Sequence, residues 1–161
     1  MPHPIPAGYH TITTSLMVKG AAEAIEFYKR AFGAEEISRM PMPGPDSRPR
    51  IGHAELKLGD SRVFLADEFP EHGMLGPQGG APPVSMFLYV TDANAAFARA
   101  VEAGATVQMP LGDMFWGDRF GKLADPFGHV WSIAEHLEDV APEQLMERMK
   151  ASGTGGGCPE E

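Results

Sequence analysis

The stretch FWGDRFGKLADPFGHVWSI, residues 115–133, decides the fold because it predicts two strands joined by a tight turn. The turn is DPFG at 125–128, where Pro supplies a φ of about −65° and Gly tolerates a positive φ. Residues 119–124 and 129–134 flank it, and they mix apolar with polar side chains in the alternation of half-buried strands. The sequence therefore predicts a β-hairpin with one face in the core.

Trp116 lies at the start of this stretch, beside Asp118 and Arg119. A large aromatic side chain next to a charged pair suits the wall of a small-molecule pocket. The simpler interpretation is a core hairpin in which the arginine only pairs with the neighbouring aspartate. The stretch by itself favours the simpler interpretation.

The hairpin completes a pattern that occurs twice in the chain. Val18 and Val90, which each precede a predicted helix, are 72 positions apart, and Gly33 and Gly104, which each end one, are 71 apart. Such internal repeats are a strong clue to architecture. The sequence predicts an α+β fold of two tandem βαβββ modules, with strands at 10–18, 34–40, 51–58, 62–66, 83–90, 105–111, 119–124 and 129–134 and helices at 21–32 and 93–103.

The segments before and between the modules are rich in Gly and Pro, and the segment after the second module has the pattern of a separate helix. In the last part of the chain, a stripe of Leu145, Met146 and Met149 would dock on a partner subunit or on the chain's own sheet. We divide the chain into an N-terminal lead (1–9), a first βαβββ module (10–69), a Gly/Pro-rich linker (70–82), a second module (83–137), a C-terminal helix (138–150) and a disordered tail (151–161).

The composition is ordinary for a globular chain of 161 residues, with 43% hydrophobic and 22% charged residues. A net charge of −9 argues against a nucleic-acid or anionic membrane partner, because phosphates are held mainly by Lys and Arg. No apolar run approaches the roughly 20 residues that span a bilayer, and we see no signal peptide. The single cysteine, Cys158, excludes an internal disulfide. We therefore expect a cytoplasmic protein.

Two tandem βαβββ modules resemble the vicinal oxygen chelate superfamily, which includes glyoxalase I, bleomycin-resistance proteins and extradiol dioxygenases. AIEFYKRAFGAE at 24–35, LADE at 65–68, FWGDR at 115–119 and DPFGH at 125–129 are similar to its PhnB-like branch. The resemblance spans about residues 10–142. It implies a cupped eight-stranded mixed sheet with the pocket on its concave face, usually within a dimer, so we expect a homodimer.

The resemblance also implies a divalent metal, whose ligands lie on the first, fourth, fifth and eighth strands of glyoxalase-like members. The corresponding positions here are Thr13, Leu65 or Ala66, Ser85 and Ser132. Hydroxyl and methyl groups cannot replace the imidazole and carboxylate ligands of Zn, Fe or Mn. We therefore expect no cofactor, unless a different register on the fourth strand turns Asp67 or Glu68 inward and restores a metal site.

His53 and Glu55 are the candidate catalytic residues, because residues two apart on a strand project from the same face. Glu55 would orient His53 as a general base, or both would bind a metal. The alternative is a pair of polar residues on a partly solvated sheet.

Small hydroxyls and aromatic rings are the candidate ligand-binding residues. The hydroxyls would form a polar, neutral floor, the rings the walls, and one arginine the anchor for a carboxylate or phosphate. They are Thr13, Ser15, Ser85, Ser132, Phe87, Tyr89, Trp116 and Arg119. Core packing explains Phe87 and Tyr89 equally well.

Two functions follow from these residues. The first is binding of a small molecule in the concave cavity, by sequestration or carriage and without the usual metal. The second is an enzyme, either a metal-dependent lyase, isomerase or dioxygenase with displaced ligands, or a metal-free acid–base catalyst using His53 and Glu55. The lost ligands and retained aromatic residues favour binding.

Overall fold

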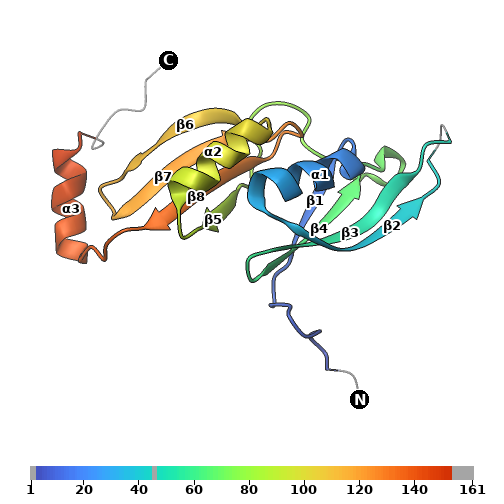
Figure 1. Cartoon of the computed structure of the whole chain (residues 1–161), viewed down its shortest axis with the longest axis horizontal. Coiled ribbons are helices and arrows are strands. Elements are labelled where there is room, and N and C mark those ends of the chain that lie inside the picture. The colour runs from blue at the N-terminus through green and yellow to red at the C-terminus, as the bar shows by residue number, and fades with distance from the viewer. Residues whose placement is uncertain (1–2, 45–46, 154–161) are drawn as a thin grey trace.

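The computed structural model describes residues 3–44 and 47–153 and contains both predicted βαβββ modules (Figure 1). The first is β1 (Thr14–Val18), α1 (Ala21–Phe32), β2 (Glu35–Met42), β3 (Arg50–Leu58) and β4 (Ser61–Asp67). The second is β5 (Met86–Tyr89), α2 (Ala93–Ala103), β6 (Thr106–Asp113), β7 (Asp118–Ala124) and β8 (Val130–His136). The short 3₁₀ helix η1 (Pro70–His72) lies between them, and α3 (Pro142–Ala151) follows. Most of the predicted disordered tail, residues 154–161, lies outside the described residues.

Each module forms its own four-stranded mixed sheet, in the orders β1-β4-β3-β2 and β5-β8-β7-β6. The first and last strands of each module pair in parallel, and the other neighbours pair antiparallel. The predicted fold class is confirmed, but the eight strands form two sheets instead of one continuous sheet, because no ladder of the described residues joins β1 to β5. Figure 1 shows the sheets side by side, with α1 and α2 on one side of the molecule.

The helix ends follow the predicted signals. Gly33 ends α1 in the left-handed region, at a φ of 67°, where its N–H donates to the Lys29 carbonyl. The Asp92 side chain caps α2 by accepting a hydrogen bond from the Ala95 N–H at 2.9 Å. Gly104 ends α2 in the same left-handed region. These caps fix where each helix returns to its sheet.

Two strands are shorter than predicted. The predicted strand 10–18 begins only at Thr14, whose partner is Val63 near the start of β4. The predicted strand 83–90 begins at Met86, after two prolines that have no N–H for a ladder. Thr13 and Ser85 therefore lie in the segments that lead into β1 and β5.

One hydrophobic core spans both modules through a buried aspartate. Asp125, in the turn before β8, accepts hydrogen bonds from the Tyr28 hydroxyl of α1 at 2.7 Å and from Trp131 Nε1 of β8 at 2.8 Å. It also accepts the backbone N–H groups of Phe127 and His129. Burial and the Asp125 carboxylate raise the pKa of Tyr28, so its hydroxyl keeps the proton that it donates. The rings of Tyr28 and Trp131 pack 5.2 Å apart, which joins the first module to the second.

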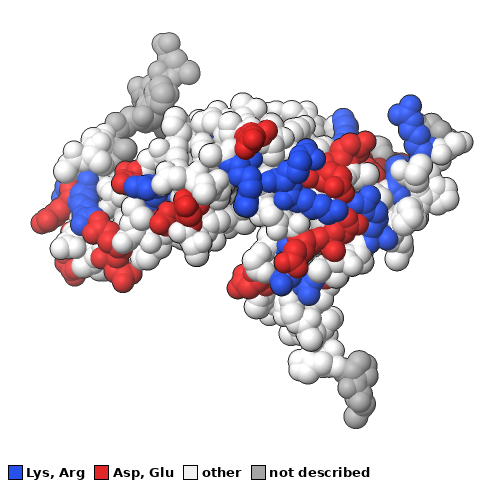
Figure 2. Space-filling model, viewed as in Figure 1, with Lys and Arg blue, Asp and Glu red and all other residues white. Residues whose placement is uncertain are grey.

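The surface around α1 carries alternating charges (Figure 2). Lys29 Nζ lies 2.9 Å from Glu26 and 2.6 Å from Glu36, and Arg39 Nε lies 2.7 Å from Glu36. Hydrogen bonds from Arg39 and Lys29 lower the pKa of Glu36 to about 2. On the visible face, basic side chains form a band across the middle of the surface, flanked by acidic side chains.

The C-terminal helix stands apart at the end of the second sheet (Figure 1). In the described part of the chain, α3 packs against no strand of either sheet. Met146 is exposed, and Leu145 and Met149 are half-buried. Docking of this stripe on its own sheet is therefore wrong, whereas docking on a partner subunit stays a prediction. None of the described helices is long and apolar enough to cross a membrane.

Candidate functional site

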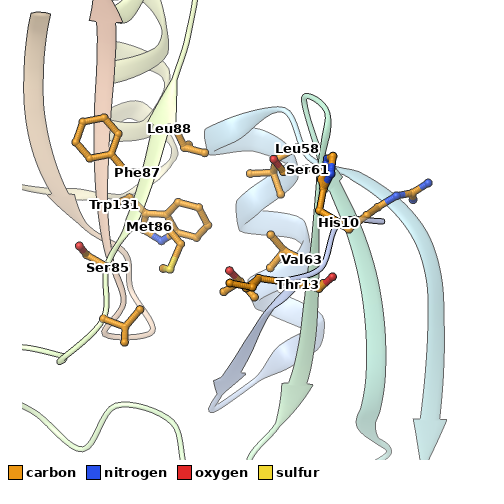
Figure 3. Close-up of a pocket in the computed structure, with 14 residues that line it drawn as sticks. His10, Thr13, Leu58, Ser61, Val63, Ser85, Met86, Phe87, Leu88 and Trp131 are labelled. Carbon is orange, nitrogen blue, oxygen red and sulfur yellow. The ribbon is translucent and has the colours of Figure 1, made fainter. Parts of the chain in front are cut away.

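A cavity of about 260 Å³ lies between the facing edges of the two sheets (Figure 3). Thr13 and Val63 line it from the first module, and Ser85, Met86 and Phe87 line it from the second. Polar and apolar residues therefore share the lining of the cavity, as expected for a small-molecule site. This cavity brings together three of the predicted ligand-binding residues.

A second cavity of about 410 Å³ lies beneath the linker, where Ser15 and Met17 of β1 face the segment 75–83. Glu68 holds this segment in place by accepting hydrogen bonds from the Gly76 N–H at 2.8 Å and the Gln78 side chain at 2.9 Å. Ser15 therefore lines a cavity next to the one that holds Thr13 and Ser85.

His53 and Glu55 lie on the open face of the first sheet, the face that α1 does not cover. The intervening Ala54 is fully buried and belongs to the core, so its two neighbours project from the opposite face. The partner of Glu55 is Arg62 on β4, whose Nη1 lies 2.9 Å from Oε1, although the angle falls outside hydrogen-bond geometry. The His53 ring instead packs at its edge against Phe64, 4.8 Å away. The two predicted partners are thus engaged with other residues.

The open face of the second sheet is organised around Asp118, which is 4% exposed. Its carboxylate accepts hydrogen bonds from the Tyr89 hydroxyl at 3.0 Å and Trp116 Nε1 at 3.2 Å, and lies 2.8 Å from His136 Nδ1. The other ring nitrogen of His136 lies 3.0 Å from Asp139. Hydrogen bonds to Asp118 and Asp139 raise the pKa of His136, because both carboxylates favour the charged imidazolium.

Aromatic rings extend this face. Phe87 stacks on Phe120 with ring centroids 5.5 Å apart and contacts Tyr89 at 5.1 Å, while Trp116 meets Phe120 edge-on at 5.6 Å. Phe87 is 50% exposed and Tyr89 is 64% exposed, so both rings are available to a ligand or to another protein surface. Core packing, the alternative interpretation of these two residues, is wrong.

Arg119 and Ser132 contribute to neither cavity. Gly121 faces Phe97 of α2, and strand alternation places Arg119 on this same face, opposite the rings of Trp116 and Phe120. Arg119 Nε pairs with Asp113 at 2.7 Å, which corrects both its expected role as a pocket anchor and its expected pairing with Asp118. Ser132 is 2% exposed and lines neither cavity.

Asp118 and His136 were missed as a pair, although the hairpin register could have found them. Ala124 pairs with Val130 next to the turn, and counting outward along both strands places Asp118 opposite His136. Predicting that Tyr89 bonds to Asp118 would have required knowing that β5 pairs with β8, and no local sequence pattern shows this pairing.

The two open faces carry the same residue types in exchanged positions. Ser15 of β1 pairs with Phe64 of β4, whereas Phe87 of β5 pairs with Ser132 of β8. Each module therefore has one serine and one phenylalanine at this point, in opposite order.

The residues present do not fit the metal that this fold implies. Leu65 and Ser132 are buried, and Asp67 is committed to the backbone, where it accepts the N–H groups of Gly20, Ala21 and Ile51 at 2.6–3.0 Å. Among the described residues, no group of three or more His, Cys, Asp or Glu side chains lies close enough to hold an ion.

The sequence profile of the Glyoxalase/Bleomycin resistance protein/Dioxygenase superfamily matches residues 9–133, and the chain belongs to this superfamily. The uncharacterized protein Rv0887c of Mycobacterium tuberculosis is 40% identical over 148 residues, which cover 89% of this chain and 85% of that protein. Protein PA1353 from Pseudomonas aeruginosa is similar in structure, with a TM-score of 0.64 and 30% identity over 80% of this chain and 99% of its own. A PhnB protein from Bacillus cereus has a TM-score of 0.61 at 23% identity, covering 78% of this chain and 99% of its own, and shares the fold.

Proposed function

We propose that this chain binds a small, partly aromatic molecule in the cavity between its modules and sequesters or carries it without a chelated metal. The observation that carries this proposal is the cavity itself, which hydroxyl-bearing Thr13 and Ser85 line together with the apolar Val63 and Met86. Such a mixed lining suits a ligand with one aromatic and one polar part. The positions that would hold a metal carry hydroxyl or aliphatic side chains.

Screening a library of aromatic acids, phenols and heterocycles by thermal shift, followed by calorimetry on the hits, tests this proposal. Met86→Trp, which enlarges a side chain that points into the cavity (Figure 3), would block the cavity and abolish binding of a hit, whereas Thr106→Phe, at an exposed position on β6, would leave binding unchanged. A hit that binds the Met86→Trp variant as tightly as the wild type would place the ligand elsewhere and overturn the proposal.

Elemental analysis of freshly purified, untagged protein tests the metal-free part. We expect less than about a tenth of a Zn, Ni, Mn or Fe ion per chain. The reason is that the hydroxyl groups at Thr13 and Ser85 are poor ligands for these ions. A value near one ion per chain would overturn this part of the proposal.

Acid–base catalysis is the second candidate function, and the pair formed by His136 and Asp118 favours it. A buried carboxylate that holds one nitrogen of a half-exposed, charged imidazole orients a general acid, whose second N–H would turn from Asp139 to the ligand. A reaction of a screened ligand that His136→Gln abolishes, while ligand binding persists, would support catalysis.

We also propose a homodimer. Its support is the exposed aromatic face of Phe87 and Tyr89, together with α3, which packs against no strand in the described part of the chain. Sedimentation velocity at micromolar concentration should give the mass of two chains, and a monomer at that concentration would refute the dimer.

A further inference from the structure

The N-terminal lead places one tyrosine on the open face of the first sheet. The Tyr9 N–H donates to the Pro6 carbonyl at 3.2 Å, and Gly8 has a φ of +83°. A four-residue turn with Gly in a left-handed conformation at its third position has the geometry of a type II turn. This turn presents the Tyr9 side chain to the sheet, although Tyr9 itself belongs to no strand or helix.

Three side chains from β3 and β4 surround the Tyr9 ring. Phe64 lies 5.9 Å away between ring centroids, at an angle of 52°, and the Arg62 guanidinium lies 5.6 Å from the centroid. The Glu55 carboxylate raises the pKa of Tyr9, which keeps the hydroxyl protonated. An aromatic contact, a cation over the ring and a charged acceptor at its hydroxyl are the interactions that recognise a phenol.

The surrounding residues belong to the sheet, whereas the backbone of Tyr9 belongs to a turn of the lead. Glu55 and Arg62 lie on neighbouring strands and pair with each other, so the polar end of this site is built without the lead. His53 packs on Phe64 as well. The lead can therefore leave without disturbing the strands that form the site.

The ring site adjoins the cavity between the modules. Arg62 lines that cavity while its guanidinium lies over Tyr9, and His10, the next residue of the lead, lines it as well (Figure 3). Displacing the lead would consequently expose one continuous surface from the cavity to Glu55.

We propose that Tyr9 is a removable occupant of a ring-binding site formed by Glu55, Arg62 and Phe64, and that the ligand places a phenol or similar hydrogen-bond-donating ring there in its stead. This site narrows the ligand class of the proposed function, on which it rests. Tyr9 then acts as a tethered competitor that lowers the apparent affinity of the free protein by the fraction of molecules in which it is docked.

The probe that tests this site is 4-methylphenol, which is the tyrosine side chain without its backbone. Tyr9→Ala should bind it at least about fivefold more tightly than the wild type, because the tethered competitor is gone. Ile5→Ala, a truncation in the same lead but outside the site, should behave as the wild type. NMR titration gives both the affinity and the place, since the His53 ring protons should shift as the probe contacts Phe64.

Two further measurements separate a built site from nonspecific binding. Glu55→Gln in the Tyr9→Ala background should weaken 4-methylphenol binding severalfold but leave toluene, which has no hydroxyl, unaffected. Equal affinities of Tyr9→Ala and wild type, or a gain of affinity without a shift at His53, would overturn the inference. A matching circular dichroism spectrum of each variant shows that the sheets remain folded.

The outcomes also distinguish the two proposals. If a screened ligand binds the cavity of the wild type but Tyr9→Ala gains no affinity for 4-methylphenol, the ring site is refuted and the proposed function stands. The opposite result is that Tyr9→Ala binds 4-methylphenol more tightly than the wild type, but no screened molecule binds the cavity of either protein. In that case the proposed function is refuted, and the ring site is supported as a separate phenol-binding site.

Discussion

Replacing Asp125 with alanine should destabilise the whole chain, because this carboxylate joins the two modules. Tyr28 and Trp131, each 1% exposed, would lose the acceptor of their buried O–H and N–H groups. A hydrogen bond to a charged group contributes about 1.5–3 kcal/mol, so losing two costs about 3–6 kcal/mol. The backbone N–H groups of the turn are part-buried and can turn to water. The expected loss is a large fraction of the roughly 5–15 kcal/mol by which a domain is stable.

Urea unfolding, followed by far-ultraviolet circular dichroism and tryptophan fluorescence, measures this loss. Asp139→Ala is the matched control, because its carboxylate is fully exposed and its pairing with a half-exposed histidine contributes little. If Asp125→Ala does not fold, Tyr28→Phe provides the test, with an expected loss of about 1.5–3 kcal/mol for the one hydrogen bond removed. A cost below about 1 kcal/mol for Asp125→Ala would refute the role of this aspartate, since even one unsatisfied buried donor costs more.

Three further predictions concern backbone strain and pH. Gly117→Ala should cost about 2–4 kcal/mol in urea unfolding, because a Cβ at a φ of +100° would also clash with the Glu138 carbonyl; a neutral result would contradict this. The pKa of His136 in the folded protein is raised above its usual 6.5, so the stability that this histidine contributes is complete below pH 6.5 and is lost as the pH rises through the folded pKa. His136→Gln should therefore remove this pH dependence from the free energy of unfolding. An unchanged pH profile in the variant would contradict the prediction. Glu36, with its pKa lowered to about 2, stabilises the fold above pH 4.5 and loses this effect as the pH falls toward 2, so Glu36→Gln should be less acid-sensitive than the wild type in circular dichroism.

Local patterns in the sequence predicted the elements well where a single physical rule decides them. Gly33 and Gly104 end helices because they adopt left-handed conformations, and the DPFG turn sets the register of β7 against β8. The nearly equal offsets between the halves predicted two modules of the same order. The gap between the two sheets could not be predicted, because it depends on which strand edges remain unpaired after α1 and α2 pack.

The candidate site was predicted only in part, because residue type says little about which face of a strand a side chain occupies. His53 and Glu55 share a face as predicted, but the partner of Glu55 comes from β4. Leu123 is fully buried in the core, and extending its alternation back along β7 would have placed Arg119 on the α2 side. Tyr9 gave no signal, since it belongs to a proline-rich lead with no periodicity.

Because serine and phenylalanine are exchanged between the two modules, the two ends of a bound ligand would meet different surroundings. A duplicated module pair with identical faces would accept a molecule equally well in either of two orientations. Here a ligand that reaches from one face to the other meets Ser15 beside Phe64 at one end and, at the other, Phe87, whose pairing partner Ser132 is buried. Duplication thus supplied the symmetry, and the swapped side chains remove it, so that one end of an elongated molecule is distinguished from the other.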